Sequence, residues 1–245
     1  MSIRKKILAI SIGPVLVLGV ITLLFMLTMV KSSLMDEVQD ALKGTAAATL
    51  AAYDQNTGDY LESTNGDIWK GSYNISKSEN LVDRIKENTG MDVTFFYGNK
   101  RIMTSALDKK GNRILGSEAG ERVVNQVIKG KKPFFSTNVS LDGTRNYGYF
   151  IPVYQNGTTD QVIGMVFVGT NKAQKDAIVN KILGSIMMAL LVVMLLCIVT
   201  AMRMAASISK NIKNSVAVVG KLADGDLNVW VDEKLLKRKD EIGDL

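Results

Sequence analysis

Residues 91–105, MDVTFFYGNKRIMTS, contain two extended runs separated by a short turn. The first run, Met91–Tyr97, is rich in β-branched and aromatic residues, which favour strands. Gly98-Asn99-Lys100 supplies the turn, and Arg101–Ser105 continues as a second extended run. Two such runs joined by a turn that contains glycine and asparagine predict a β-hairpin.

Three more extended runs follow the hairpin at Pro133–Leu141, Arg145–Tyr154 and Gln161–Thr170. The dipeptides Asp142-Gly143 and Asn156-Gly157 mark the turns between them. The last run is almost entirely apolar, as is typical of a central strand that is covered on both faces. These runs therefore predict a meander of three antiparallel strands.

Two segments have helical periodicity. Apolar residues recur every three or four positions in Lys31–Tyr53 and again in Ser117–Gly130. The order is then a long helix, two strands, a helix and three strands. This order predicts an α+β domain in which an antiparallel sheet has its helices on one side.

Two stretches are long and uncharged: Ile7–Val30, with 24 residues, and Ile182–Met202, with 21. About 20 apolar residues span the hydrocarbon core of a bilayer, so both are predicted transmembrane helices. The alternatives are a cleaved signal peptide for the first and a buried core helix for the second. The first is longer than a signal core and has no clear cleavage motif before Lys31.

Basic residues at the ends of the two spans predict that both termini are cytoplasmic. Arg4, Lys5 and Lys6 precede the first span, and Arg203 and Lys210 follow the second. The predicted domains are 1–6, a cytoplasmic N-terminus; 7–30, the first span; 31–181, an extracytoplasmic domain; 182–202, the second span; and 203–245, a cytoplasmic segment.

The composition argues against several functions. The chain has no histidine, which is the commonest general base and metal ligand, and its only cysteine, Cys197, lies in the second span. We therefore expect no enzyme activity, no cofactor and no metal, although a membrane-anchored enzyme or a structural anchor remains an alternative. The net charge of +6 follows largely from the flanks of the spans, so we expect no nucleic-acid partner.

The segment after the second span carries two short motifs: LADGDL at 222–227 and DEIGDL at 240–245. Before them, apolar positions spaced four and three apart from Ile208 to Leu222 form a heptad seam, which implies a partner helix. An amphipathic helix on the lipid surface is the alternative. The two motifs resemble those of a HAMP domain, although Asn211 stands where such domains usually carry proline. The resemblance implies a homodimer, formed through the HAMP and sensor helices.

The predicted extracytoplasmic domain, 31–181, resembles the PAS-like single Cache domain of bacterial transmembrane receptors. The similar segments are VTFFYGNKRIMTS, GNRILG, VIKGKKPFF, YFIPVY and VIGMVFVG, between Val93 and Gly169. The resemblance implies binding of a small molecule, often a carboxylate, on the membrane-distal face of the sheet.

Strand alternation and this resemblance together suggest a ligand site rich in arginine, tyrosine and hydroxyl groups. An arginine beside neutral donors is suited to a carboxylate. The candidates are Arg101, Thr104, Phe134, Ser136, Arg145, Tyr147 and Tyr149. In the alternative interpretation Arg101 is solvated and the tyrosines only pack. Arg113 is expected to shape the turn before the second helix.

The leading hypothesis is the sensory region of a methyl-accepting chemotaxis protein, anchored in membrane lipid. It would detect a small ligand and pass the signal to cytoplasmic proteins through an output region beyond Leu245. The alternative output is a histidine kinase or a cyclic-dinucleotide enzyme.

Overall fold

The computed structural model describes residues 3–225. The chain divides into two compact units: residues 1–30 with 182–245, and Lys31–Lys181. We describe each by itself. The predicted second helix of the HAMP-like segment, which would begin at Asp240, lies outside the described residues.

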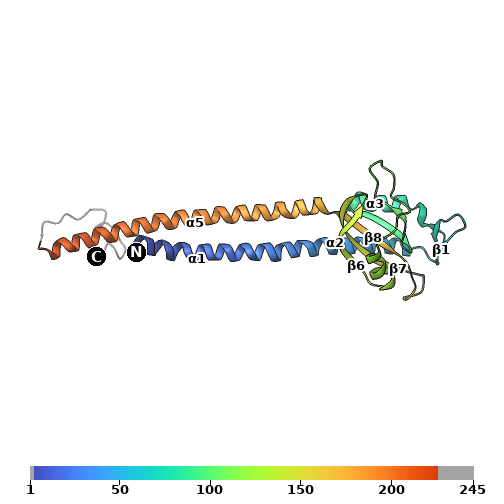
Figure 1. The fold of residues 1–245 in the computed structure, drawn as a ribbon, viewed down its shortest axis with the longest axis horizontal. Helices are drawn as coiled ribbons and strands as arrows, with labels where there is room; N and C mark the ends of the chain where they lie inside the picture. Colours follow the sequence, from blue (N-terminus) through green and yellow to red (C-terminus); the bar gives the residue numbers. More distant parts are fainter. Residues whose placement is uncertain (1–2, 226–245) are drawn as a thin grey trace. The chain divides into compact units, whose positions relative to one another are not determined.

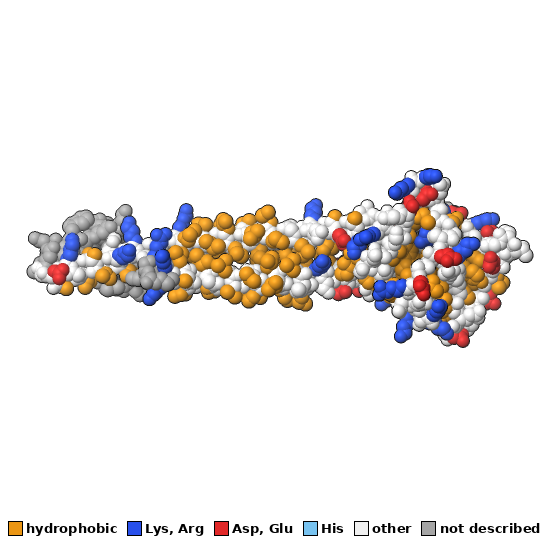
Figure 2. Space-filling view, viewed as in Figure 1, with side chains coloured by type: hydrophobic (Ala, Val, Ile, Leu, Met, Phe, Trp, Pro, Cys, Tyr) orange, Lys and Arg blue, Asp and Glu red, His pale blue; other side chains and the backbone are white. Residues whose placement is uncertain are grey.

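The first unit contains two helices that are long and apolar enough to cross a membrane by length and composition. One comprises α1 (Ile3–Phe25) and the π-helical turn η1 (Met26–Val30), and runs on into α2 (Lys31–Asp54). The other is the second part of α5 (Lys172–Ala223). Exposed apolar side chains cover both, which Figure 2 shows as a continuous orange stretch. Exposed side chains of this kind are costly in water and favourable in lipid.

Helix α5 ends where the sequence predicts a helix stop. The N–H of Asp224 donates to the carbonyl of Gly220, and the N–H of Gly225 donates to that of Leu222, both at 3.1 Å. Gly225 has φ of +84°, a left-handed conformation that favours glycine and ends helices.

The second unit is built on a five-stranded antiparallel sheet with the order β5-β4-β8-β7-β6. Figure 1 labels β6, β7 and β8 of this sheet. Its strands are β4 (Asp92–Tyr97), β5 (Lys100–Thr104), β6 (Phe134–Leu141), β7 (Thr144–Tyr154) and β8 (Val162–Asn171). The hairpin β4–β5 and the meander β6–β7–β8 confirm the prediction from sequence. The apolar run 161–170 is indeed the central strand, β8, between β4 and β7.

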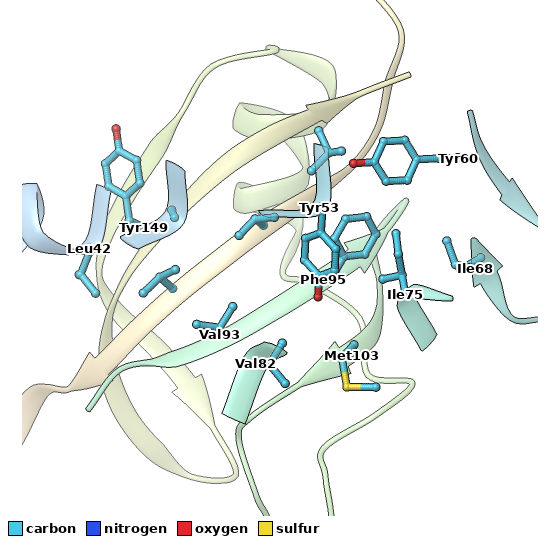
Figure 3. Close-up of a cluster of buried hydrophobic side chains, with 14 of the residues drawn as sticks. Leu42, Tyr53, Tyr60, Ile68, Ile75, Val82, Val93, Phe95, Met103 and Tyr149 are labelled. Atoms are coloured by element: carbon cyan, nitrogen blue, oxygen red, sulfur yellow. The ribbon is translucent and has the colours of Figure 1, made fainter. Parts of the chain in front are cut away.

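Helices α2 and α3 (Glu79–Thr89) cover one face of this sheet. Its core includes Leu42, Tyr53, Val82 and Phe95, all fully buried (Figure 3). Phe95 meets Tyr53 edge to face at 5.1 Å between ring centroids. Such an aromatic pair contributes about 0.5–1.5 kcal/mol beyond the area it buries.

The other face carries a smaller core and the helix that follows β5 in the chain. That helix is short, α4 (Glu121–Val123) followed by the π-helical η3 (Val124–Lys129), and it buries Val127. The sequence predicted a longer helix, 117–130, and helices on one side only. The structure differs because residues 113–120 form an irregular segment that pairs with the edge of β5.

The structure has five further elements that were not predicted: β1 (Tyr60–Glu62), β2 (Ile68–Lys70), β3 (Tyr73–Asn74), η2 (Ile75–Lys77) and α3. The three strands form a small antiparallel sheet, and the 3₁₀ turn η2 leads into α3. The small sheet is joined to the end of α2 through Lys70, which is 2% exposed and pairs with Asp54 at 3.2 Å.

Candidate functional site

A cavity of about 540 Å³ opens on the sheet face opposite α2. Strands β4 to β8 form its floor, and residues 118–123 and β6 form its walls. Its lining includes Phe96, Arg101, Glu118, Arg122, Val123, Phe134, Ser136, Val139, Phe150 and Phe167.

The floor of the cavity is aromatic. Phe150 on β7 and Phe167 on β8 lie 4.8 Å apart between ring centroids, and Phe134 on β6 lies 6.4 Å from Phe150. The strands place these rings together because β7 pairs with both β6 and β8, with Phe150 opposite Phe134 and Phe167. Apolar rings of this kind accept the hydrocarbon part of a ligand.

Arg101 supplies a positive charge inside the cavity. Arg101 is only 7% exposed, and no carboxylate among residues 3–225 lies within ion-pair distance of its guanidinium. One guanidinium nitrogen donates to the carbonyl of Ile114 at 3.4 Å, and the buried Nε has no partner among the described residues. A buried donor without a partner carries a desolvation cost, which an anion bound beside it would offset.

The aromatic floor also contacts this charge. The guanidinium carbon of Arg101 lies 5.3 Å from the centroid of the Phe96 ring. Burial lowers the pKa of the Arg101 guanidinium from its ordinary value, and the charge of Asp92 partly opposes this. The ordinary value is so far above neutrality that arginine stays charged in proteins.

The rim is polar. Arg122 lies over the ring of Phe134 at 5.4 Å, and Glu118 provides an opposing carboxylate. Edge strand β6 adds hydroxyl and amide groups between Ser136 and Ser140, where the strand has a β-bulge. Bulges are common beside functional sites because they redirect the backbone locally.

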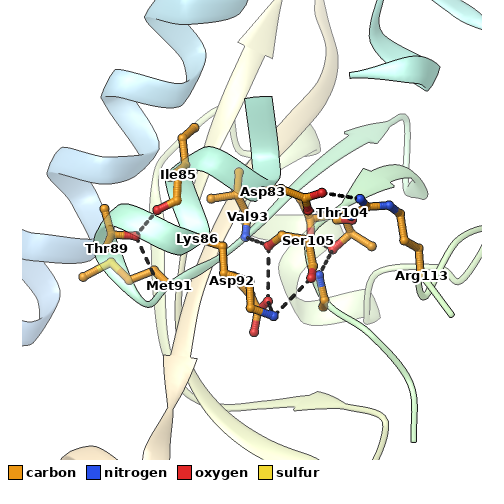
Figure 4. A network of polar contacts seen from close by, with 12 residues as sticks. Asp83, Ile85, Lys86, Thr89, Met91, Asp92, Val93, Thr104, Ser105 and Arg113 are labelled. Carbon is orange, nitrogen blue, oxygen red and sulfur yellow. Dashed lines mark hydrogen bonds and ion pairs between the residues drawn. The ribbon is translucent and has the colours of Figure 1, made fainter. Parts of the chain in front are cut away.

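The 113–120 segment, whose residues 118–120 line the cavity, is held by backbone hydrogen bonds to β5. The N–H of Arg101 donates to the carbonyl of Ser117, and the N–H of Gly116 donates to the carbonyl of Arg101, both at 2.9 Å. Arg113 then ties the start of this segment to α3 through Asp83 (Figure 4). This contact agrees with the structural role expected for Arg113.

The structure brings together three of the seven predicted site residues, since Arg101, Phe134 and Ser136 line the same cavity. Thr104 is fully buried outside it and shares a 2.7 Å hydrogen bond with Thr94. Arg145 is exposed near the start of β7.

Tyr147 and Tyr149 lie on the opposite face of β7, in the core beneath α2. Both faces of β7 are buried, so alternation alone could not identify which one borders the cavity. The residues that line it from β7 and β8 are Phe150 and Phe167, which sequence reasoning did not select. Gly148 was one signal for Phe167, since a Cβ at this position would collide with the Phe167 ring and with Val139.

The comparison with protein families agrees with this architecture. A family model described as single cache domain 3 matches residues 73–182. No curated protein matches the chain.

Among solved structures, an extracellular ligand binding receptor from Desulfohalobium retbaense is 15% identical with a TM-score of 0.42; the match covers 60% of this chain and 25% of that one. The ligand-binding domain of the Campylobacter jejuni chemoreceptor Tlp3 in complex with L-valine is 10% identical with a TM-score of 0.41. That match covers 72% of this chain and 64% of the other. The Escherichia coli DcuS sensor domain is 13% identical with a TM-score of 0.36, covering 57% and 98%.

The family match spans the region from β3 to the first part of α5 and includes the whole five-stranded sheet with its cavity. The chain therefore contains a single Cache domain, with a PAS-like α+β fold built on an antiparallel sheet and a long N-terminal helix.

Proposed function

We propose that this chain is the sensory region of a transmembrane receptor that binds a small organic acid in the Cache domain. The observation that carries the proposal is Arg101, a buried guanidinium in an aromatic cavity that has no ion-pair partner among residues 3–225 and whose Nε has no hydrogen-bond partner there. A carboxylate is its natural partner, because charge-assisted hydrogen bonds to guanidinium are about twice as strong as neutral ones.

The shape and lining of the cavity define the ligand further. A volume of about 540 Å³ falls within the range of small-molecule sites. One buried charge faces an apolar floor, so the expected ligand has one carboxylate and an apolar body. Hydroxyl groups of β6, such as that of Ser136, would bind a second polar group near the rim.

The expected placement is a membrane protein with the Cache domain outside. Two apolar helices support this, and the basic residues Arg4, Lys5 and Lys6 before one and Arg203 after the other favour cytoplasmic termini. The heptad seam on α5 supports a homodimer. We also propose that the signal passes inward through the HAMP-like segment that follows the second apolar span.

For the output we propose chemotaxis signalling, with a histidine kinase or cyclic-dinucleotide enzyme as the alternative. We propose no catalytic activity for the chain itself. Ligand binding would shift the population between two arrangements of the helix that leads inward.

A thermal-shift screen of residues 31–181 tests ligand binding. This unit contains both hydrophobic clusters of the sheet, so it has its own core. Benzoate, propionate, succinate, citrate, amino acids and amines form the panel. We expect an apolar monocarboxylate to raise the melting temperature, because a ligand that binds only the folded state stabilises it. No shift with any acid up to millimolar concentration would contradict the proposal.

The output is tested separately, by deleting the gene from its source organism and measuring swimming toward the acid that binds. Loss of this response alone supports chemotaxis. An intact response, with changed transcription or cyclic-dinucleotide levels, supports the alternative.

A further inference from the structure

We propose that two contacts between the sheet and the first turns of α5 couple the cavity to that helix. They are Tyr147 with Asp176 and Lys172 with the carbonyl of Thr137. The inference rests on the proposed function, because it takes the cavity as the ligand site, and it identifies the residues through which occupancy would act.

The first element is the bulge in β6. Ser136 pairs with Gly148 and Val139 pairs with Asn146, so β6 has one more residue than β7 over this interval. The bulged residues line the cavity. Because β6 is an edge strand, its backbone is paired on one side only and can adjust more readily than a central strand.

The second element is the contact of this bulge with α5. The carbonyl of Thr137 accepts a hydrogen bond from Nζ of Lys172 at 3.2 Å. The same Nζ lies 4.8 Å from the centroid of the Tyr147 ring. One lysine at the start of α5 therefore contacts both β6 and β7.

Tyr147 completes the connection. Its hydroxyl donates to Oδ1 of Asp176 at 2.5 Å, and its ring lies nearly parallel to that of Phe135 on β6, with centroids 6.3 Å apart. Lys172 and Asp176 are four residues apart, which places them on the same face of the helix. That face of the helix therefore contacts β6 and β7, two of the strands that line the cavity.

No loop separates the sheet from the helix. Strand β8 ends at Asn171, α5 begins at Lys172, and the side chain of Asn171 accepts the N–H of Gln174 at 3.1 Å. Such a cap fixes the start of a helix. A shift of β6 and β7 relative to β8 must therefore either break the contacts of Lys172 and Asp176 or move the start of α5.

Hydrogen–deuterium exchange of the 245-residue chain in lipid nanodiscs tests the coupling between the cavity and α5. A larger side chain introduced into the cavity takes the place of a bound ligand. Ser136→Phe adds a ring at the β6 wall of the cavity. We expect it to change exchange of the amides of residues 172–181 by about two- to tenfold, the range of one or two hydrogen bonds. With Tyr147→Phe and Lys172→Gln also present, the change should fall below about 1.5-fold.

Tyr149→Phe is the matched control. Tyr149 lies two residues along the same face of β7, and among the described residues Tyr147 makes the only side-chain hydrogen bond to Asp176. With Tyr149→Phe present, Ser136→Phe should still change the exchange of residues 172–181. If removing the two contacts acted only through a general loss of packing, Tyr149→Phe would abolish that change as well.

Two results would overturn the inference: no change at 172–181 with Ser136→Phe, or the same change after the contacts are removed. If near-UV circular dichroism shows that Ser136→Phe does not fold, Val139→Phe provides the same probe. No ligand is added, so these results are separate from the outcome of the acid screen.

Discussion

Arg113 and Asp83 form a two-bonded ion pair, with nitrogen–oxygen distances of 2.8 and 2.5 Å, between the 113–120 segment and α3. The same guanidinium donates to the carbonyl of Thr104 at 2.7 Å. Three elements, α3, β5 and the 113–120 segment, are thus joined at one side chain (Figure 4). The contact holds the start of the segment whose end, at residues 118–120, lines the cavity.

Arg113→Met should lower the stability of residues 31–181 by about 1 kcal/mol, since it removes a partly exposed ion pair and one hydrogen bond to a backbone carbonyl. Urea unfolding monitored by circular dichroism measures the change. Lys77→Met is the control. Lys77 is 69% exposed and 3.6 Å from Asp67, so its loss should cost less than about 0.5 kcal/mol. Equal effects would contradict the role given to Arg113.

The same pair predicts an acid dependence. The hydrogen bond from Arg113 lowers the pKa of the Asp83 carboxyl below its ordinary value. A carboxyl with a lowered folded-state pKa adds stability above its unfolded pKa of about 3.9, and this is lost as pH falls through the folded value. The difference in unfolding free energy between wild type and Asp83→Asn should therefore be constant from pH 7 to 5 and should shrink as the pH falls below 4. A difference that grows on acidification would exclude this assignment.

Arg101→Gln should weaken binding of the acid found in the screen by about 10- to 100-fold, because it removes a charge-assisted hydrogen bond in a site shielded from water. Isothermal titration calorimetry measures the affinity. Stability should fall little or rise, since the substitution also removes a buried and unpaired charge. Arg145→Gln, at an exposed arginine outside the cavity, should leave the affinity unchanged.

The sheet could be predicted from the sequence because each strand has a local signal. Alternation, β-branched residues and Asp-Gly or Asn-Gly turns were enough to place the β4–β5 hairpin, the meander and the central position of β8. These signals depend on neighbouring residues alone. Helix α3 was missed, although Leu81, Val82 and Ile85 have helical spacing, because the segment is short and largely polar.

The cavity was only partly predictable. Arg101 was selected by the resemblance to similar sensors, and Phe134 and Ser136 because they share one face of their strand; all three line the cavity. Tyr147 and Tyr149 lie on the other face of β7. The face depends on where α2 packs, which is a long-range contact. The wall at 113–120 has no periodicity, and its position is fixed by hydrogen bonds to β5 that only the folded chain reveals.

Gly164→Ala should destabilise the sheet by about 1–3 kcal/mol, as overpacking of a close contact does. Gly164 lies opposite Tyr97 on the central strand β8, and a Cβ at this position would collide with the carbonyl of Phe96 on β4. Gly120→Ala is the control, since its Cβ would meet nothing within 4 Å. Thermal unfolding of both variants of residues 31–181 measures the difference. Equal melting temperatures would show that β4 and β8 can separate slightly at little cost.

Alkaline unfolding provides a test of the contact between Tyr147 and Asp176 without any ligand. Burial, and then the hydrogen bond and charge of Asp176, raise the pKa of Tyr147 to about 12. A tyrosine whose folded pKa is raised adds stability that is fully present below its unfolded pKa of about 10 and is lost as pH rises toward the folded value.

The difference in unfolding free energy between wild type and Tyr147→Phe should therefore be constant from pH 6 to 9 and then shift against the wild type between pH 10 and 12. Burial also raises the pKa values of Tyr53 and Tyr60, so both chains lose stability in this range, and only their difference reports Tyr147. Asp176→Asn keeps the shape of the acceptor but removes its charge, so it should lower the folded pKa of Tyr147. Measured between Asp176→Asn and the double variant with Tyr147→Phe, the shift should still begin near the unfolded pKa of about 10, but should end at a lower pH and be smaller in total. A shift of unchanged size in Asp176→Asn would mean that burial alone raises the pKa of Tyr147, and that the charge of Asp176 does not act on its hydroxyl.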